Sequence, residues 1–382
     1  MTVARWGWYQ GAMARNKNAQ SQSKEELVSG VGRAGKYLAA LHVSRAEVLL
    51  LTALYGSVLA IAHWAGMFWG LLALAVALLV AGRLVARLLR YALWEQWKRI
   101  DRETRDAELL ASGFDWRPVV VLSVVAVVLI GNNYFGHRQH FRYIVAQIYK
   151  KPADAPYLKG ASFRNAGSHG GVQLVYQRRF VARYGSWAHI IEFAYWVGWR
   201  VVGFLLLPIV VVLLLPGESL GDYGLRTKGL TKHLWIYLVL FMIVLPAVIL
   251  VSYTPAFRSH YPFPWSGGRI RGDVHGSQLL TWELMYAAQF FSLEFFFRGF
   301  MLNALRRSMG AYAIFAMVVP YCMIHFGKPI AETFGAIAAG LVLGTLALGT
   351  RSIWSGFFIH VSVALSMDLA ALVQKGALPR LW

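Results

Sequence analysis

Residues 292–300, Ser-Leu-Glu-Phe-Phe-Phe-Arg-Gly-Phe (SLEFFFRGF), place a carboxylate and a guanidinium inside a long apolar stretch. Glu294 and Arg298 are four residues apart, so on a helix they lie one turn apart and can form an ion pair. A single charge is expensive in hydrocarbon, and pairing lowers that expense. The stretch therefore predicts a buried polar site inside a helical bundle or, alternatively, a structural ion pair that fixes helix packing.

The composition around this stretch predicts an all-α polytopic membrane protein. Of the 382 residues, 57% are hydrophobic and 15% are charged, and the mean hydropathy is +0.48. Several apolar runs reach about eighteen residues, which is enough to cross a bilayer as a helix. An open sheet would leave backbone groups unpaired in lipid. We expect about eight to nine transmembrane helices, ending in a four-helix core.

The charge and cysteine content exclude other classes of protein. The net charge is +20, but Lys and Arg gather between the apolar runs, as topology signals and anionic lipid head groups would explain, so nucleic-acid binding is not expected. Cys322 is the one cysteine, which excludes an internal disulfide and a cysteine-rich metal cluster. The first residues lack the apolar core of a secretory signal, so we expect the spans themselves to direct insertion.

The pattern along the chain predicts five segments. They are a polar lead at 1–46, a membrane-associated segment at 47–136, a polar basic loop segment with short elements at 137–186, two membrane spans with linkers at 187–274, and the core at 275–375.

Three features are expected within the 47–136 segment. The apolar run 48–82 is too long for one crossing and predicts a hairpin that turns near residues 63–66. Residues 83–110 have apolar residues at helical spacing and a basic face, which predicts a helix on or just below the membrane surface. Residues 119–136 form a further, short span.

In the next part of the chain, His189, Glu192 and Arg200 flank an apolar run and are interpreted as interfacial residues.

The core is predicted to contain four helices, at 278–304, 311–326, 330–349 and 352–374. We estimated depth from 1.5 Å per residue, counted from the turns near Gly310 and Arg351. Glu294 and His325 come roughly 22–24 Å from one membrane face, His360 roughly 15 Å and Asp368 about 27 Å. These side chains fall in one slab of the bundle, so they can converge if their helices face them inward.

Two histidines and a carboxylate at one depth suit acid–base chemistry, in which the carboxylate takes a proton from water while the imidazoles hold or donate protons. His325, His360 and Glu332 would also suit a divalent metal such as zinc, although no HExxH pair is present. No other cofactor is expected. Each histidine is alternatively a packing residue.

Three motifs in order resemble the signatures of the CPBP family of intramembrane endopeptidases, which comprises type II CAAX prenyl endopeptidases and bacteriocin-processing, or Abi, proteins. The family pattern is Glu-Glu-x-x-x-Arg, Phe-x-x-x-His and His-x-x-x-Asn on successive membrane helices. This chain has Glu294-Phe-Phe-Phe-Arg298, Tyr321-Cys-Met-Ile-His325, and His360 within GFFIHVSVALSMD. The resemblance covers about residues 275–375, and the preceding link GESLGDYGLRTKGL resembles a segment common in bacterial members.

The resemblance implies an endopeptidase of the bacterial inner membrane that hydrolyses a peptide bond in a membrane-associated, lipidated or prenylated protein or peptide. Water activated by the first Glu and the histidines would attack the carbonyl, and the Asn would help hold the oxyanion. Glu294 takes the place of the second Glu, Arg298 of the Arg, and His325 and His360 of the histidines. Tyr321 takes the aromatic position. The implied partners are membrane lipids and the substrate.

Two positions depart from the family pattern: Leu293 replaces the first Glu and Ala364 replaces the Asn. Glu332, after a tight FGKP turn, is the predicted substitute base, although an acid in a first helical turn is also ordinary dipole placement. Asp368 lies one turn beyond Ala364 on about the same face, or alternatively near the interface. The predicted catalytic residues are therefore Glu294, His325, His360, Glu332, Arg298 and Asp368.

The same two departures motivate an alternative, a catalytically inactive relative that serves as a membrane scaffold, an immunity factor or a partner-binding protein. A third hypothesis is a transporter that uses the buried carboxylates as proton relays. Its usual indicator, paired broken helices in two related halves, is not apparent in the sequence.

Overall fold

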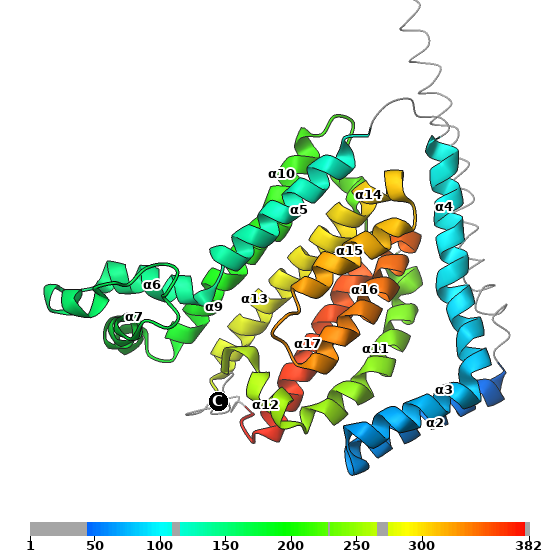
Figure 1. Cartoon of the computed structure of the whole chain (residues 1–382), viewed down its shortest axis with the longest axis horizontal. Helices are drawn as coiled ribbons and strands as arrows, with labels where there is room; N and C mark the ends of the chain where they lie inside the picture. Colours follow the sequence, from blue (N-terminus) through cyan, green and yellow to red (C-terminus); the bar gives the residue numbers. More distant parts are fainter. Residues whose placement is uncertain (1–43, 109–114, 228–229, 266–273, 379–382) are drawn as a thin grey trace, which may run out of the picture. The chain divides into compact units, whose positions relative to one another are not determined.

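The described part of the chain is built from helices (Figure 1). The computed structural model describes residues 44–108, 115–227, 230–265 and 274–378, and no strand occurs among them. The predicted all-α class is confirmed. The polar lead predicted at 1–46 lies almost entirely outside the described residues.

Six described helices are long and apolar enough to cross a membrane: Ala46–Ala65, Leu72–Arg105, Arg117–Tyr134, Trp187–Leu214, Glu332–Thr350 and Trp354–Gln374. Two shorter apolar helices span Tyr237–Ser252 and Tyr312–Met323. Many large apolar side chains on these helices are exposed, such as Leu79, Leu214 and Val319, as lipid contact requires. The chain is therefore an integral membrane protein, with six such helices among the described residues where the sequence predicted about eight to nine spans.

The first structural unit, up to Ala92, contains a helical hairpin. Helix α2 (Arg45–Ala65) begins with a capping box, in which Ser44 Oγ accepts from the Glu47 backbone N–H at 3.2 Å and Glu47 Oε2 accepts from the Ser44 backbone N–H at 2.8 Å. Gly66 ends the helix with a φ of 95°, which a glycine adopts readily. Helix α3 (Met67–Leu89) packs back against α2. The break lies inside the predicted turn.

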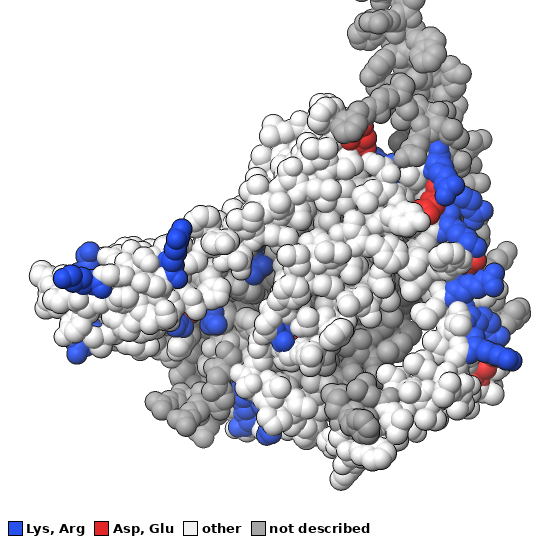
Figure 2. Space-filling model, viewed as in Figure 1, with Lys and Arg blue, Asp and Glu red and all other residues white. Residues whose placement is uncertain are grey.

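The second unit begins at Leu93, within a helical run that continues from α3. The π-helical segment η1 (Arg90–Trp94) leads into α4 (Glu95–Glu108), so the amphipathic helix predicted at 83–110 is not a separate element. Helix α4 packs on the core: Trp97 Nε1 donates to Thr345 Oγ1 at 2.9 Å. Lys and Arg side chains gather along it, whereas the face of the bundle in view is almost free of charge (Figure 2).

Residues 137–186 form a helical lobe where the sequence predicted mainly a loop. Its elements are α6 (Arg138–Tyr149), η2 (Pro152–Leu158), α7 (Gly170–Val175), η3 (Tyr176–Val181) and α8 (Ala182–Tyr184). Short helices form here because they bury apolar side chains against one another and against the following helix, among them Val145, Tyr176, Phe180 and Ala188.

Glu192, which the sequence suggested to be interfacial, has a side chain that is buried within the protein. It is 0% exposed and accepts hydrogen bonds from Arg142 Nε and Nη2, at 3.1 and 2.9 Å, and from the Tyr176 hydroxyl at 3.1 Å. These bonds join the lobe to α9 (Trp187–Val201). Helix α9 continues through η4 (Val202–Leu206) into α10 (Leu207–Leu214).

The core contains the four predicted helices within a few residues of their expected ends. The first is a continuous run of α13 (Gly276–Glu294), the π-helical segment η7 (Phe295–Met301) and α14 (Leu302–Met309). The others are α15 (Tyr312–Met323), α16 (Ile330–Thr350) and α17 (Trp354–Gln374). Around them lie α5 (Arg117–Tyr134), η5 (Leu220–Tyr223), α11 (Leu230–Ser252), α12 (Pro255–His260) and η6 (Phe263–Trp265).

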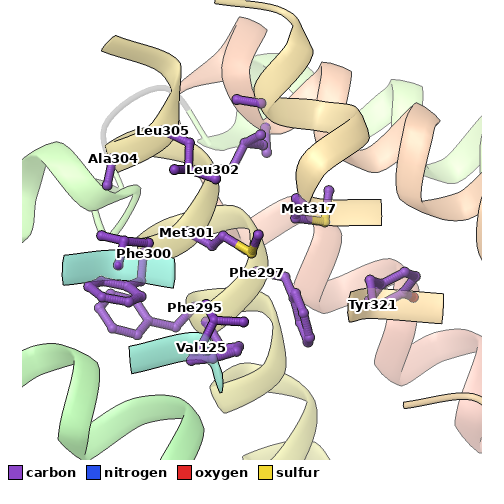
Figure 3. Packing of buried hydrophobic residues seen from close by; sticks show 14 of the residues in the cluster. Val125, Phe295, Phe297, Phe300, Met301, Leu302, Ala304, Leu305, Met317 and Tyr321 are labelled. Atoms are coloured by element: carbon purple, nitrogen blue, oxygen red, sulfur yellow. The ribbon is translucent and has the colours of Figure 1, made fainter. Parts of the chain in front are cut away.

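The phenylalanines of the opening stretch form the centre of the main hydrophobic cluster (Figure 3). Phe295, Phe296, Phe297 and Phe300 are all 0% exposed. Phe296 packs on Phe204 of η4, with ring centroids 4.8 Å apart, and Phe297 packs edge-on against Tyr321 of α15 at 5.4 Å. Segment η7 is thereby packed against both α15 and η4, which helps to fix Glu294 before it and Arg298 within it.

Candidate active site

Glu294 and Arg298 form a fully buried ion pair at the junction of α13 and η7. Arg298 Nη1 lies 3.0 Å from Glu294 Oε1, and both side chains are at most 1% exposed. The guanidinium also lies over the ring of Tyr321, 4.0 Å from its centroid. A π-helical segment is wider than an α-helix and often marks a functional site. The predicted pairing within SLEFFFRGF is therefore present in the fold.

His360 of α17 meets this pair. Its Nδ1 lies 2.6 Å from Glu294 Oε1, and its ring stacks on Phe290, with centroids 5.5 Å apart and planes at 14°. A nitrogen lone pair and a carboxylate oxygen this close would repel each other, so we assign a proton to Nδ1. Gly356, one turn before His360, allows the approach, because a Cβ there would overlap Glu294 Oε2.

The depths estimated from the sequence separated Glu294 from His360 by several ångströms, whereas the structure brings them into contact. Depths counted from the turns are valid only where both turns lie at one level and the helices run parallel. The contact shows that this geometry does not hold in the bundle, because the side chains meet although they lie at unequal distances along the chain from those turns.

Tyr321 of α15 connects the two histidines. Its hydroxyl lies 3.1 Å from His360 Nε2, and its ring centroid is 4.8 Å from that of His325. His325 Nδ1 lies 2.9 Å from the backbone oxygen of Tyr321, so Nδ1 donates and Nε2 is left as an acceptor. His325 lies in the turn after α15, where burial and the nearby Lys328 ammonium lower its pKa to about 3.

Hydrogen-bonding capacity at this site is not used up by protein atoms. Both oxygens of Glu294, three nitrogens of Arg298 and Nδ1 of His360 are buried without a directed hydrogen-bond partner among the described residues. The charges are at ion-pair distance, but their N–H bonds do not point along the contacts. Buried polar groups of this kind are usually satisfied by ordered water or a ligand.

Glu332 lies in a separate group at the start of α16. Its Oε1 accepts from Lys328 Nζ at 2.7 Å, and its Oε2 accepts from the Tyr261 hydroxyl at 2.7 Å. Its charge acts on His325, although no contact joins Glu332 to Glu294 or His360 among the described residues. The bond from Tyr261 holds the segment between α12 and η6 against the core.

Asp368 lies in a second buried group, about 12 Å along α17 from His360. Its Oδ2 accepts from Trp282 Nε1 at 2.8 Å, its side chain is 1% exposed, and its Oδ1 has no hydrogen-bond partner within the described chain. Asp368 is thus buried within the protein. The structure brings it to α13, two turns away from the Glu294–His360 contact.

Apolar, buried side chains occupy the two positions that depart from the family pattern. Leu293 is 5% exposed in the main hydrophobic cluster, and Ala364 is 6% exposed beside Trp282 and Tyr286. Both positions are thus occupied by apolar side chains within hydrophobic clusters.

A metal site is not formed by the residues suggested for it. Among the described residues, no group of three or more His, Cys, Asp or Glu side chains is arranged to hold a metal ion. His360 turns one nitrogen to Glu294 and the other to Tyr321, His325 uses Nδ1 on a backbone oxygen, and both oxygens of Glu332 are occupied. In this arrangement the three do not fit a shared ion.

The residues that form the Glu294 site lie in one segment of the chain: Glu294, Arg298, Tyr321, His325 and His360. Residues 275–366 match the family model of the Rce1-like type II CAAX prenyl endopeptidases. This segment, below called the Rce1-like segment, is similar to that family. The resemblance to the CPBP endopeptidases is confirmed, and the matched segment contains Glu294, Arg298, His325 and His360, whereas Asp368 lies beyond it. No curated protein and no solved structure matches the chain.

Two contributors to the Rce1-like site were not singled out from the sequence. No role was predicted for the Tyr321 hydroxyl, because the position was interpreted only as the aromatic residue of its motif. Gly356 stands four residues before His360 on the same helical face, which is the signal that would have indicated close helix contact.

Proposed function

We propose that the chain is an intramembrane endopeptidase that hydrolyses a peptide bond in a membrane-associated or prenylated protein or peptide. The observation that carries this proposal is the 2.6 Å contact between Glu294 and His360, which joins two motifs of the Rce1-like segment. A carboxylate that holds a proton on Nδ1 leaves Nε2 of a neutral imidazole as an acceptor, which is the arrangement of a general base.

In the proposed reaction, a water molecule near His360 gives one proton to Nε2 while its oxygen bonds to the peptide carbonyl carbon. The carbonyl oxygen becomes an oxyanion, the C–N bond then breaks, and His360 returns the proton to the leaving amine. The products are a carboxylic acid and an amine. Glu294 stabilises the imidazolium, Arg298 balances and positions Glu294, and Nε2 of His325 accepts from the water and orients it.

The unused hydrogen-bonding capacity of the buried pair supports water at this position. Exposed apolar side chains around the bundle fit a lipid-attached substrate that approaches through the bilayer. We further propose the bacterial inner membrane as the location, because the link at 217–230 resembles a segment of bacterial family members. Membrane lipids and the substrate are the expected partners, with no role for nucleic acid.

The test uses purified full-length protein in proteoliposomes and a fluorescence-quenched peptide that carries a farnesylated cysteine. We expect cleavage by the wild type and at least about a hundredfold lower kcat for Glu294→Gln and for His360→Asn. Glu103→Gln and His189→Asn, at exposed positions, are matched controls that should retain kcat. Absence of cleavage by the wild type, alongside cleavage by a typical family member, would reject the proposal.

A second candidate, a catalytically inactive relative with a scaffold or partner-binding role, is favoured by one observation. Leu293 and Ala364 are packed in hydrophobic clusters, so two polar groups of the family pattern are absent. This candidate predicts that Glu294→Gln, His325→Gln and His360→Asn each preserve cellular function as long as the protein remains folded. Full function in all three would favour it over the endopeptidase.

A further inference from the structure

Tyr321 contacts three residues of the proposed active site, His360, His325 and Arg298. It is 1% exposed, and its hydroxyl lies 3.1 Å from His360 Nε2, the atom proposed to take the proton from water. Its ring lies beside His325 and under Arg298. The general base must hold the water close to the carbonyl carbon of the substrate. A hydroxyl beside that base is therefore placed to reach the same carbonyl group.

The guanidinium of Arg298 makes this hydroxyl a better donor. It lies 4.0 Å from the ring centroid of Tyr321. A positive charge at that distance, in an interior without bulk water, stabilises negative charge on the phenol oxygen and so strengthens the hydrogen bond that the O–H gives. Arg298 thereby acts on Glu294 and on Tyr321 at the same time.

Hydrolysis at this site requires a donor of this kind. Negative charge develops on the carbonyl oxygen in the transition state, and a preorganised donor is usually among the largest contributions to the rate. Ala364, one turn beyond His360 on α17, has no polar group to supply it. Among the side chains that contact His360, Tyr321 carries the hydroxyl.

We propose that the Tyr321 hydroxyl is the hydrogen-bond donor that stabilises the oxyanion in this protein, in place of the side chain missing at Ala364. This proposal rests on the proposed endopeptidase function. When substrate and water bind, the O–H turns about its C–O bond from His360 Nε2 to the carbonyl oxygen, and the water takes its place at Nε2. No proton leaves Tyr321 and no bond forms to it, so the step needs no co-reactant.

The experiment compares Tyr321→Phe, Ala364→Asn and the double variant in full-length protein, with the farnesylated peptide in proteoliposomes. Tyr321→Phe keeps the ring and removes one oxygen, so we expect kcat to fall about a hundredfold or more while KM changes less than about threefold. Adding Ala364→Asn to Tyr321→Phe should recover at least about tenfold in kcat. Tyr149→Phe, in the distant lobe, is the matched control and should retain kcat.

Each further outcome decides the proposal. If Tyr321→Phe keeps kcat within about threefold of the wild type while Glu294→Gln abolishes cleavage, the Tyr321 role is rejected and the endopeptidase function stands. If Tyr321→Phe lowers the melting temperature in step with kcat and no donor at 364 restores activity, its role is structural and the proposal is rejected. Ala364→Ser supplies a smaller donor should Asn at 364 disturb folding. A wild type that cleaves no peptide rejects both proposals.

Discussion

His360 Nδ1 lies 2.6 Å from Glu294 Oε1, although the two residues belong to helices α17 and α13. At this contact two motifs far apart in the sequence become one polar group. The pairing also explains how an acid persists in an apolar interior, since Arg298 and His360 both face it. Changes that alter the approach of the two helices should therefore act on the site before they act on the fold.

Gly356 tests that approach directly. A Cβ at position 356 would overlap Glu294 Oε2, so Gly356→Ala should push the carboxylate away from His360 and lower kcat at least about tenfold. Gly335→Ala is the control, because a Cβ there meets no atom within 4 Å. It should preserve kcat and slightly raise the melting temperature, since Ala favours a helix over Gly by about 1 kcal/mol. Equal peptidase activity in the two variants would contradict this interpretation of the contact.

Arg298 should be essential for stability as well as for activity. Arg298→Met leaves the Glu294 charge buried beside His360 without its main counter-ion, which typically costs about 3–5 kcal/mol. Arg226→Met breaks an exposed pair with Asp222, whose side chains are 55% and 43% exposed, and should cost less than about 1 kcal/mol. Thermal unfolding in detergent measures both.

A double variant separates charge from packing at Arg298. Adding Glu294→Gln to Arg298→Met removes the unpaired charge, so the double variant should be more stable than Arg298→Met alone. If it is less stable, shape and not charge accounts for the effect.

His325 should make stability depend on pH. Burial, together with the Lys328 ammonium, lowers its pKa from 6.5 to about 3 in the folded protein. Because the folded-state pKa is depressed, the stabilisation is fully present above about pH 6.5 and is lost as the pH falls toward 3. Between about pH 7 and pH 5 the wild type should lose roughly 1–2 kcal/mol more stability than His325→Gln. If the melting temperatures of the two proteins change equally with pH over this range, His325 is not buried as described.

Glu332 and Asp368 remain predicted catalytic residues, and the geometry ranks them below Glu294. We expect Glu332→Gln and Asp368→Asn each to change kcat less than about threefold, because neither contacts His360, whereas Glu294→Gln should abolish activity. Peptide cleavage in proteoliposomes measures all three. A loss for Glu332→Gln as large as that for Glu294→Gln, in a protein that still folds, would restore Glu332 as the base.

Glu192 should control the order of the lobe at 137–186. Glu192 is 0% exposed and accepts from Arg142 and Tyr176, so Glu192→Gln removes the counter-charge of the partly buried Arg142 guanidinium. We expect faster hydrogen exchange in α6 and η3 with peptidase activity preserved, because the lobe lies outside the Rce1-like segment. Unchanged exchange would show that the lobe is held by its apolar contacts alone.

The helices of the core were predictable because lipid enforces them. Each apolar run must satisfy its own backbone, so length and hydropathy alone gave α15, α16 and α17 within a few residues of their observed ends. The lobe was not predicted, because its helices depend on tertiary contacts rather than on a local pattern. Its short helices are stabilised by contacts to α9 through Glu192, and no local pattern in 137–186 records a partner that lies outside it.

The sequence by itself determined that this protein is an all-α membrane protein with a charged pair in its core, because the energy of burial acts locally on every apolar run and on every charge within it. Only the tertiary structure decided which groups meet. Glu294, His360 and Tyr321 lie on three helices, and their contacts depend on helix crossings, on a glycine at 356 and on phenylalanine packing around η7. These are relations between distant segments, which spacing along one helix does not encode.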